Sequence, residues 1–82
     1  MSSDLVGELK REGKSVPGAH VCLTRSDRSD RPVCTTTNRL GQYFLSVTPG
    51  VYEVTISYGN FPETKKRLDL TTAGTYRNRL IL

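Results

Sequence analysis

The stretch that most constrains the fold runs from Thr35 to Ile56, where apolar side chains recur at every second position on both sides of Pro49-Gly50. These side chains are Tyr43, Leu45 and Val47 before the pair, and Tyr52, Val54 and Ile56 after it. Alternation with a period of two, interrupted by Pro and Gly, is typical of half-buried antiparallel strands joined by tight turns. The stretch therefore predicts strands that turn one face to a core and the other to solvent.

The rest of the chain shows the same period, and no window shows the 3.6-residue period of a helix. Further strands are expected at residues 5–10, 19–24, 33–37, 64–70 and 76–82. The polar stretch from Arg11 to Ser15 predicts a turn, and the segment from Ser26 to Pro32 predicts a charged loop. Seven short strands about ten residues apart predict an all-β sandwich.

The length and the net charge of the chain limit the classes of function that we expect. The 82 residues suit one small domain spanning 1–82, with a net charge of +4 from twelve Lys and Arg against eight Asp and Glu. The basic residues are scattered among acidic ones, which favours a solvated surface over a nucleic-acid site. One basic face is expected only if the last two strands pair, which would join Lys65, Lys66 and Arg67 to Arg77 and Arg79.

No run approaches the roughly 18 apolar residues of a membrane span, and no signal peptide is visible at Met1 to Asp4. Because the strand pattern fills the chain, we expect a domain of a longer protein, with a secreted or surface location favoured.

The two cysteines, Cys22 and Cys34, are twelve residues apart in sequence. A hairpin centred near Arg28 would place them opposite each other, at a separation that permits a disulfide in an oxidising compartment. Two free thiols are the equally weighted alternative. With His20 as the single histidine, the chain offers too few ligands for a closed zinc site, so neither a metal nor a cofactor is expected.

Several local motifs occur together in a fixed order: Gly7 within the first strand, Pro17-Gly18-Ala19, Thr37-Asn38-Arg39-Leu40-Gly41-Gln42-Tyr43, and Pro49-Gly50-Val51-Tyr52-Glu53-Val54. On these residues the chain resembles the carboxypeptidase regulatory-like domain, which is related to Cna B-type domains. The resemblance implies an antiparallel Greek-key sandwich of seven strands with transthyretin-like topology. Asn38 stands where the family usually has Asp, a mild change because both residues form such turns. The resemblance also implies an accessory module rather than an enzyme.

Two reactive relatives can be compared position by position. Isopeptide-forming domains use a lysine, a buried acid and a late asparagine, but Ile56 stands where the acid is expected, so Lys10 and Asn78 lack a catalyst. Hydroxyisourate hydrolases need several histidines, and this chain has only His20. We therefore expect no enzymatic activity.

Candidate binding residues lie on the outward phase and in a loop. Phe44 and Ile81 are expected to point outward and, with Arg77 and Arg79, to form an apolar patch with a basic rim, suited to a protein partner. Tyr58 and Phe61 flank a loop that suits a protein or a sugar. The first hypothesis is thus a non-catalytic interaction or spacer module of a larger bacterial secreted or secretion-associated protein, docking a neighbouring domain or a cargo protein. The alternative is glycan or cell-surface binding through the Tyr58–Phe61 loop.

Overall fold

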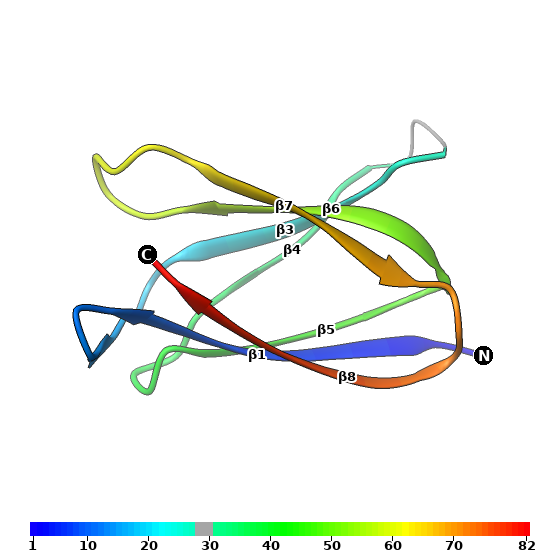
Figure 1. Cartoon of the computed structure of the whole chain (residues 1–82), viewed down its shortest axis with the longest axis horizontal. Helices are drawn as coiled ribbons and strands as arrows, with labels where there is room; N and C mark the ends of the chain where they lie inside the picture. Colours follow the sequence, from blue (N-terminus) through cyan, green and yellow to red (C-terminus); the bar gives the residue numbers. More distant parts are fainter. Residues whose placement is uncertain (28–30) are drawn as a thin grey trace.

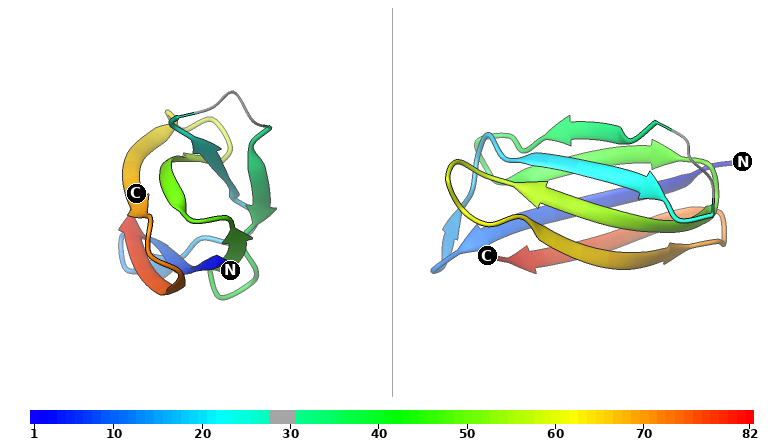
Figure 2. Two further views of the ribbon diagram at one scale, coloured as in Figure 1. Left: turned by 90° about the vertical axis from the view of Figure 1, so that its right-hand side faces the viewer. Right: turned by 90° about the horizontal axis from the view of Figure 1, so that it is seen from above.

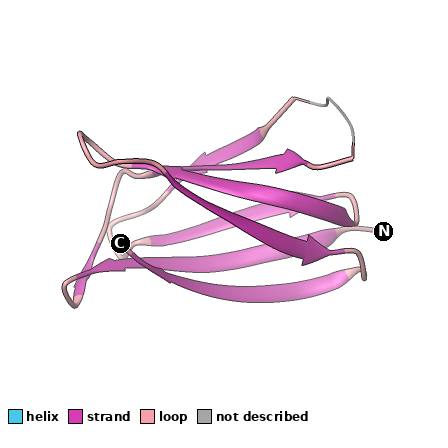
Figure 3. Ribbon diagram, turned by 45° about the horizontal axis from the view of Figure 1, so that its top comes forward, coloured by secondary structure: helices cyan, strands magenta, loops and turns pink. Residues whose placement is uncertain are grey.

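The structure, a computed structural model, describes residues 1–27 and 31–82 as strands and connections without a helix (Figure 3). The centre of the predicted charged loop, including Arg28 and Asp30, lies outside the described residues. The strands are β1 (Ser3–Arg11), β2 (Lys14–Ser15), β3 (His20–Arg25), β4 (Val33–Thr36), β5 (Gln42–Val47), β6 (Gly50–Ser57), β7 (Thr64–Leu70) and β8 (Gly74–Ile81).

The strands form two layers (Figures 1 and 2). In the first sheet β1 is central, with β5 on one side and β8 on the other, and the short β2 pairs with the end of β1. The second sheet has the order β4-β3-β6-β7. The two termini lie toward opposite ends of the long axis (Figure 1). The predicted all-β sandwich is confirmed; the transthyretin-like topology stays a prediction of the resemblance.

Two features differ from the predicted seven antiparallel strands. The polar turn after β1 contains an additional two-residue strand, β2, because Lys10 and Arg11 pair with Ser15 and Lys14. The last strand, β8, runs parallel to β1, from Ser3 opposite Gly74 to Lys10 opposite Ile81. Two parallel strands that are neighbours in a sheet need a crossover connection between them. Here the chain between β1 and β8 contains all the strands of the second sheet.

The core lies between the sheets and follows the predicted alternation. Its residues come from the inward phase of each long strand and from the loop before β3. They are Leu5, Leu9, Val16, Ala19, Val21, Leu23, Tyr43, Leu45, Val47, Tyr52, Val54, Ile56, Leu70 and Leu80. Burial of such side chains supplies most of the favourable free energy of folding, at about 1.5–3 kcal/mol for each large one.

A buried hydroxyl fastens the corner between β4 and β5. Thr37 donates from Oγ1 to the carbonyl of Val16 at 2.6 Å and accepts the N–H of Ala19 at 2.9 Å. Two backbone bonds flank this contact, from the N–H of Thr37 to Ala19 O and from the N–H of Gly18 to Thr37 O. The loop that leads into β3 is thereby held against the end of β4.

The next residues form the turn that the family motif marks. Asn38 Oδ1 accepts the N–H groups of Leu40 and Gln42 at 2.9 and 3.0 Å. Gly41 has a φ of 73°, and a Cβ there would lie 2.6 Å from the carbonyl oxygen of Leu9. Its own carbonyl accepts the N–H of Leu9 at 2.7 Å. Both the left-handed backbone and the close approach to β1 therefore require glycine.

The motif glycine of β1 has a different role. Gly7 lies opposite Tyr43 on β5 and opposite Asn78 on β8, so the three residues form one row across the sheet. A Cβ at Gly7 would overlap the Tyr43 ring, which shows that the ring lies across the glycine. Burial raises the pKa of Tyr43, and the Asn78 amide only partly opposes that rise. Within the described part of the chain, Tyr43 Oη and Asn78 Nδ2 are buried without hydrogen-bond partners.

Replacement of the Thr37 hydroxyl tests the corner. Thr37→Val should lower the free energy of unfolding by about 2–4 kcal/mol, because it leaves the carbonyl of Val16 and the N–H of Ala19 buried without a partner. Thr37→Ser keeps the hydroxyl and should cost less than half as much. Urea denaturation of the two variants measures the difference, and equal losses would contradict the assigned hydrogen bonds.

Gly7→Ala tests the row across the first sheet. The methyl group should displace the Tyr43 ring and lower the free energy of unfolding by about 3 kcal/mol. In a Tyr43→Leu background, which removes the overlapping ring atoms, the same substitution should cost less than 1 kcal/mol. A double-mutant cycle by urea denaturation gives both values. If the cost of Gly7→Ala is the same in both backgrounds, contact with the ring is not its cause.

Candidate protein-interaction surface

The outer face of the first sheet carries the most prominent exposed aromatic side chain. Phe44 on β5 is 57% exposed and lies opposite Val6 on β1, which in turn lies opposite Arg77 on β8. The three side chains thus form one row across the sheet. We call them the docking row. Val6 was not among the predicted binding residues, although the alternation around Leu5 places it on the outward phase of β1.

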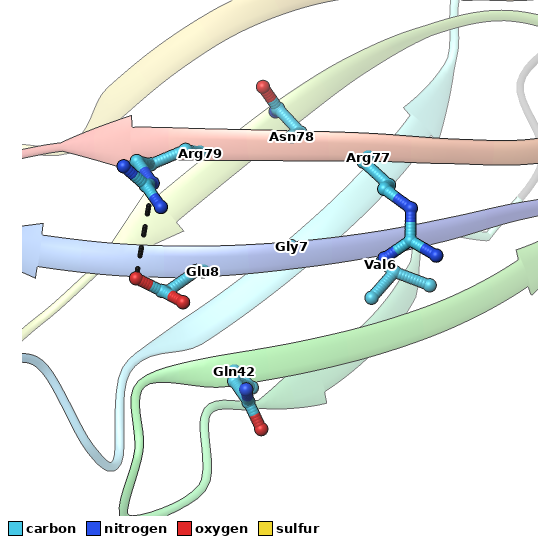
Figure 4. Close-up of a pocket in the computed structure, with 7 residues that line it drawn as sticks. All are labelled: Val6, Gly7, Glu8, Gln42, Arg77, Asn78 and Arg79. Carbon is cyan, nitrogen blue, oxygen red and sulfur yellow. Dashed lines mark ion pairs between the residues drawn. The ribbon is translucent and has the colours of Figure 1, made fainter.

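A shallow groove of about 320 Å³ lies beside the docking row (Figure 4). Arg77 extends from β8 toward Val6, and Arg79 reaches Glu8 on β1, with 4.0 Å between Arg79 Nε and Glu8 Oε1. Lys10 lies 3.6 Å from the same carboxylate oxygen. Glu8 is therefore shared by two cations, whereas Arg77 has no ion pair among the described residues. The groove is lined mainly by polar and charged residues, with Val6 and Gly7 as its apolar part, and it presents a guanidinium that is available to an anionic group.

Ile81 shares this face but does not join the docking row. It lies opposite Lys10, four residues along β1 from Val6, which corresponds to about 13 Å. The intervening row is polar, with Gln42 and Arg79 on either side of Glu8. The predicted patch around Phe44 and Ile81 is thus divided into two exposed apolar side chains on one face, with the polar row that contains Arg79 between them, while Arg77 lies in the row of Phe44.

The loop with Tyr58 and Phe61 is packed against the rest of the domain and does not project freely into solvent. The rings of Tyr58 and Phe61 are parallel within 5°, with centroids 5.8 Å apart. The guanidinium of Arg11, at the end of β1, lies 3.6 Å from the centroid of the Phe61 ring. Tyr58 is half-buried against the core, and Phe61 is 43% exposed. The Arg11 contact was not predicted, since nothing in the local sequence marks this residue among the other cations.

The basic face that would suit nucleic acid is not formed. β7 pairs with β6 in the second sheet, and β8 pairs with β1 in the first. Lys65 and Arg67 lie on the outward phase of β7, and Arg77 and Arg79 lie on the outward phase of β8. Because the two outer faces point away from each other, these cations cannot follow one phosphate backbone.

The comparisons with known proteins agree with this geometry. A family model described as the carboxypeptidase regulatory-like domain matches residues 6–82. The chain belongs to this family. No match is found among curated protein sequences.

Two solved structures share the fold of this carboxypeptidase regulatory-like domain. One is a DUF3823 family protein from Parabacteroides merdae, with 16% identity and a TM-score of 0.69 over 98% of this chain. The chain spans 44% of that protein. The other is the dioxygenase domain of a dioxygenase carbohydrate-binding protein fusion from Streptomyces sp. SirexAA-E. It has 11% identity and a TM-score of 0.75, over 99% of this chain and 80% of that one. At these identities the likeness concerns the fold alone.

The structure brings together none of the reactive groups of the relatives considered above. Lys10 lies on the outward phase of β1 and Asn78 on the inward phase of β8, so an isopeptide bond between them would have to cross the sheet. Ile56 is buried in the core at the position of the missing acid. Within residues 1–27 and 31–82, no three His, Cys, Asp or Glu side chains gather to hold a metal ion. The same part of the chain contains no helix long and apolar enough to cross a membrane.

The second sheet carries a disulfide on its outer face. Cys22 on β3 lies opposite Cys34 on β4, and the structure joins them. The hairpin also ends in a cluster that the sequence did not predict. Arg25 pairs with Asp27 at 2.6 Å and donates to Thr48 Oγ1 at 3.0 Å, and the hydrogen bond to Asp27 raises the pKa of Arg25. These contacts fix the hairpin to the turn before β6.

Proposed function

We propose that residues 1–82 form one non-catalytic domain that docks a neighbouring domain or a separate protein. The observation that carries this proposal is the docking row, in which Phe44 is 57% exposed beside Val6 and Arg77. An exposed aromatic ring beside an aliphatic side chain and a guanidinium has the composition of an interface core, in which aromatic residues and Arg are enriched. A partner would place an apolar side chain on Phe44 and an acidic group at Arg77.

We further propose that the domain belongs to a larger, secreted or surface-associated bacterial protein. The Cys22–Cys34 disulfide supports this location, because such bonds persist in oxidising compartments. The P. merdae structure supports the membership of a larger protein, since the same fold there occupies 44% of a longer bacterial chain. Such a module would hold its partner without contributing a reactive group.

Phe44→Asp tests the docking row. The substitution places a carboxylate where an apolar contact is proposed and should weaken capture of the partner at least tenfold, at unchanged stability, because the side chain is exposed. Leu40→Asp is the matched control, since Leu40 is 62% exposed but lies in the turn before β5. Proteins retained from a lysate of the source organism by the unmodified domain are identified by mass spectrometry, and the Kd of each is measured with both variants. If both variants bind every such partner equally, the docking row is not the interface.

Carbohydrate binding through the Tyr58–Phe61 loop is the second candidate. The two parallel rings offer an aromatic surface of the kind on which sugar rings stack, although the Arg11 guanidinium lies over the Phe61 ring. The Streptomyces structure is the dioxygenase domain of a dioxygenase carbohydrate-binding protein fusion, so this fold occurs there in a chain that also has a carbohydrate-binding part. Against it, Tyr58, Phe61 and Arg11 already cover part of one another's surface.

Removal of the exposed ring tests this alternative. Phe61→Ala should abolish retardation of the domain in affinity electrophoresis through soluble polysaccharides, because the aromatic surface would be lost. Phe44→Ala is the control, since it removes an exposed ring from another surface. An unmodified domain that no polysaccharide retards would contradict the candidate, as would equal retardation of both variants.

A further inference from the structure

One side of the β8 backbone is free. The N–H of Gly74 donates to Ser2 O at 3.2 Å, and the N–H of Leu82 donates to Lys10 O at 2.8 Å. In a strand, the N–H and C=O of one residue point to the same side, and successive residues alternate. The even-numbered residues therefore face β1. The odd-numbered residues, Thr75, Arg77, Arg79 and Ile81, present their N–H and C=O groups at the outer edge, where no described strand pairs with them.

One edge strand of the other sheet, β7, is protected in a way that β8 is not. Lys66 of β7 lies on the inward phase, between the half-buried Thr64 and Leu68. An inward-pointing charge on an edge strand prevents a further strand from being added, because its side chain would be buried. In β8 both charges, Arg77 and Arg79, are on the outward phase, and the inward phase is uncharged. With eight residues from Gly74 to Ile81, β8 is also the longest edge strand described.

A cavity adjoins the end of this edge. Its volume is about 300 Å³, and it opens between the start of β7 at Thr64 and the end of the chain at Leu82. Ile56, Tyr58 and Phe61 form much of its apolar lining. A strand added to β8 would have inward-pointing side chains on this side of the sandwich. One apolar side chain near its end would reach the cavity, which is large enough for a leucine or phenylalanine.

The charges of β8 decide what kind of strand fits. In the longest antiparallel registers that match the faces of two copies, Arg77 lies opposite Arg77 or Arg79 of the second copy. Like charges directly opposite each other destabilise a strand pair, so a second copy is disfavoured. A strand with acidic side chains opposite Arg77 and Arg79 would instead form ion pairs with these two residues. Arg77, which has no ion pair among the described residues, is available for this.

We propose that β8 takes an extended, acidic segment of a partner protein as an additional strand of the first sheet. The segment alternates acidic side chains, opposite Arg77 and Arg79, with apolar ones, of which one enters the cavity beside Leu82. The proposal rests on the docking role proposed above and shares Arg77 with the docking row, but it uses the β8 edge, whereas Phe44 lies on β5 at the other edge of the sheet. Backbone hydrogen bonds supply affinity in strand addition, and alternate side chains supply specificity.

The probe is a synthetic seven-residue peptide in which Glu alternates with Val, and its counterpart in which Lys alternates with Val. Fluorescence anisotropy at low salt should give a Kd for the Glu peptide at least tenfold below that for the Lys peptide. Arg77→Glu/Arg79→Glu should reverse this order. In the complex, amide hydrogen exchange measured by NMR should slow at least tenfold at Thr75, Arg77, Arg79 and Ile81. The amides of β4, at an edge of the second sheet, should keep their rates.

A backbone variant separates strand addition from simple charge attraction. Ile81→Pro removes an N–H that faces the free edge and no bond to β1, so it should weaken the Glu peptide at least fivefold, whereas Ile81→Ala should change the Kd less than twofold. Unchanged thermal melting verifies the fold of each variant. The proposal is overturned if neither peptide binds at about 1 mM, if both bind equally, or if the four edge amides stay unprotected in the complex. Phe44→Asp should leave peptide binding intact, so failure of the docking row and failure of the β8 edge are separate results.

Discussion

Side-chain hydroxyl groups that donate hydrogen bonds to the backbone carbonyls of the connections between the two sheets hold this sandwich together. A chain segment that leaves one sheet for the other carries carbonyls that no strand ladder can pair, and burying them unpaired is costly. Three side chains meet this need: Thr37 donates to Val16 O, Tyr52 to Thr48 O, and Ser3 to Leu70 O, at 2.6, 2.6 and 2.7 Å. Each of the three donors is buried. The core between the sheets can therefore be largely apolar, because the polar groups of the connections form their hydrogen bonds at its margins.

The row of Tyr43, Gly7 and Asn78 is the exception to this apolar interior. The position of the Tyr43 ring accounts for the glycine at position 7. A tyrosine ring that reaches across β1 needs a glycine beneath it, and Gly7 supplies the space. The hydroxyl then lies in the core near Asn78, where both polar groups lack partners among the described residues. Buried polar groups without partners destabilise a fold, so this row weakens the interior that the surrounding aliphatic side chains stabilise.

Local features of the fold could be predicted from the sequence, and pairings between distant strands could not. The alternation gave the inward and outward phase of each long strand, because side-chain direction depends only on the neighbouring residues. Opposition of Cys22 and Cys34 followed from a single hairpin. The parallel pairing of β8 with β1 joins the two ends of the chain, and no short-range signal marks it. For this reason the sequence left open whether the last two strands pair, which was the condition for a basic face. The distance between Phe44 and Ile81 depends on the same unpredicted register.

The two outer faces differ in a way that solvation alone does not explain. The outer face of the second sheet is mainly polar and includes the Cys22–Cys34 disulfide, Glu53, Thr55 and Lys65. Among the described residues, Val51 is the one aliphatic side chain on that face. The first sheet turns outward Val6, Phe44 and Ile81. Stability requires apolar side chains only on the inner faces, so both outer faces of a mere spacer could be equally polar. The apolar side chains on this outer face and the unprotected edge of β8 on the same sheet are the two features on which the docking role proposed for this sheet rests.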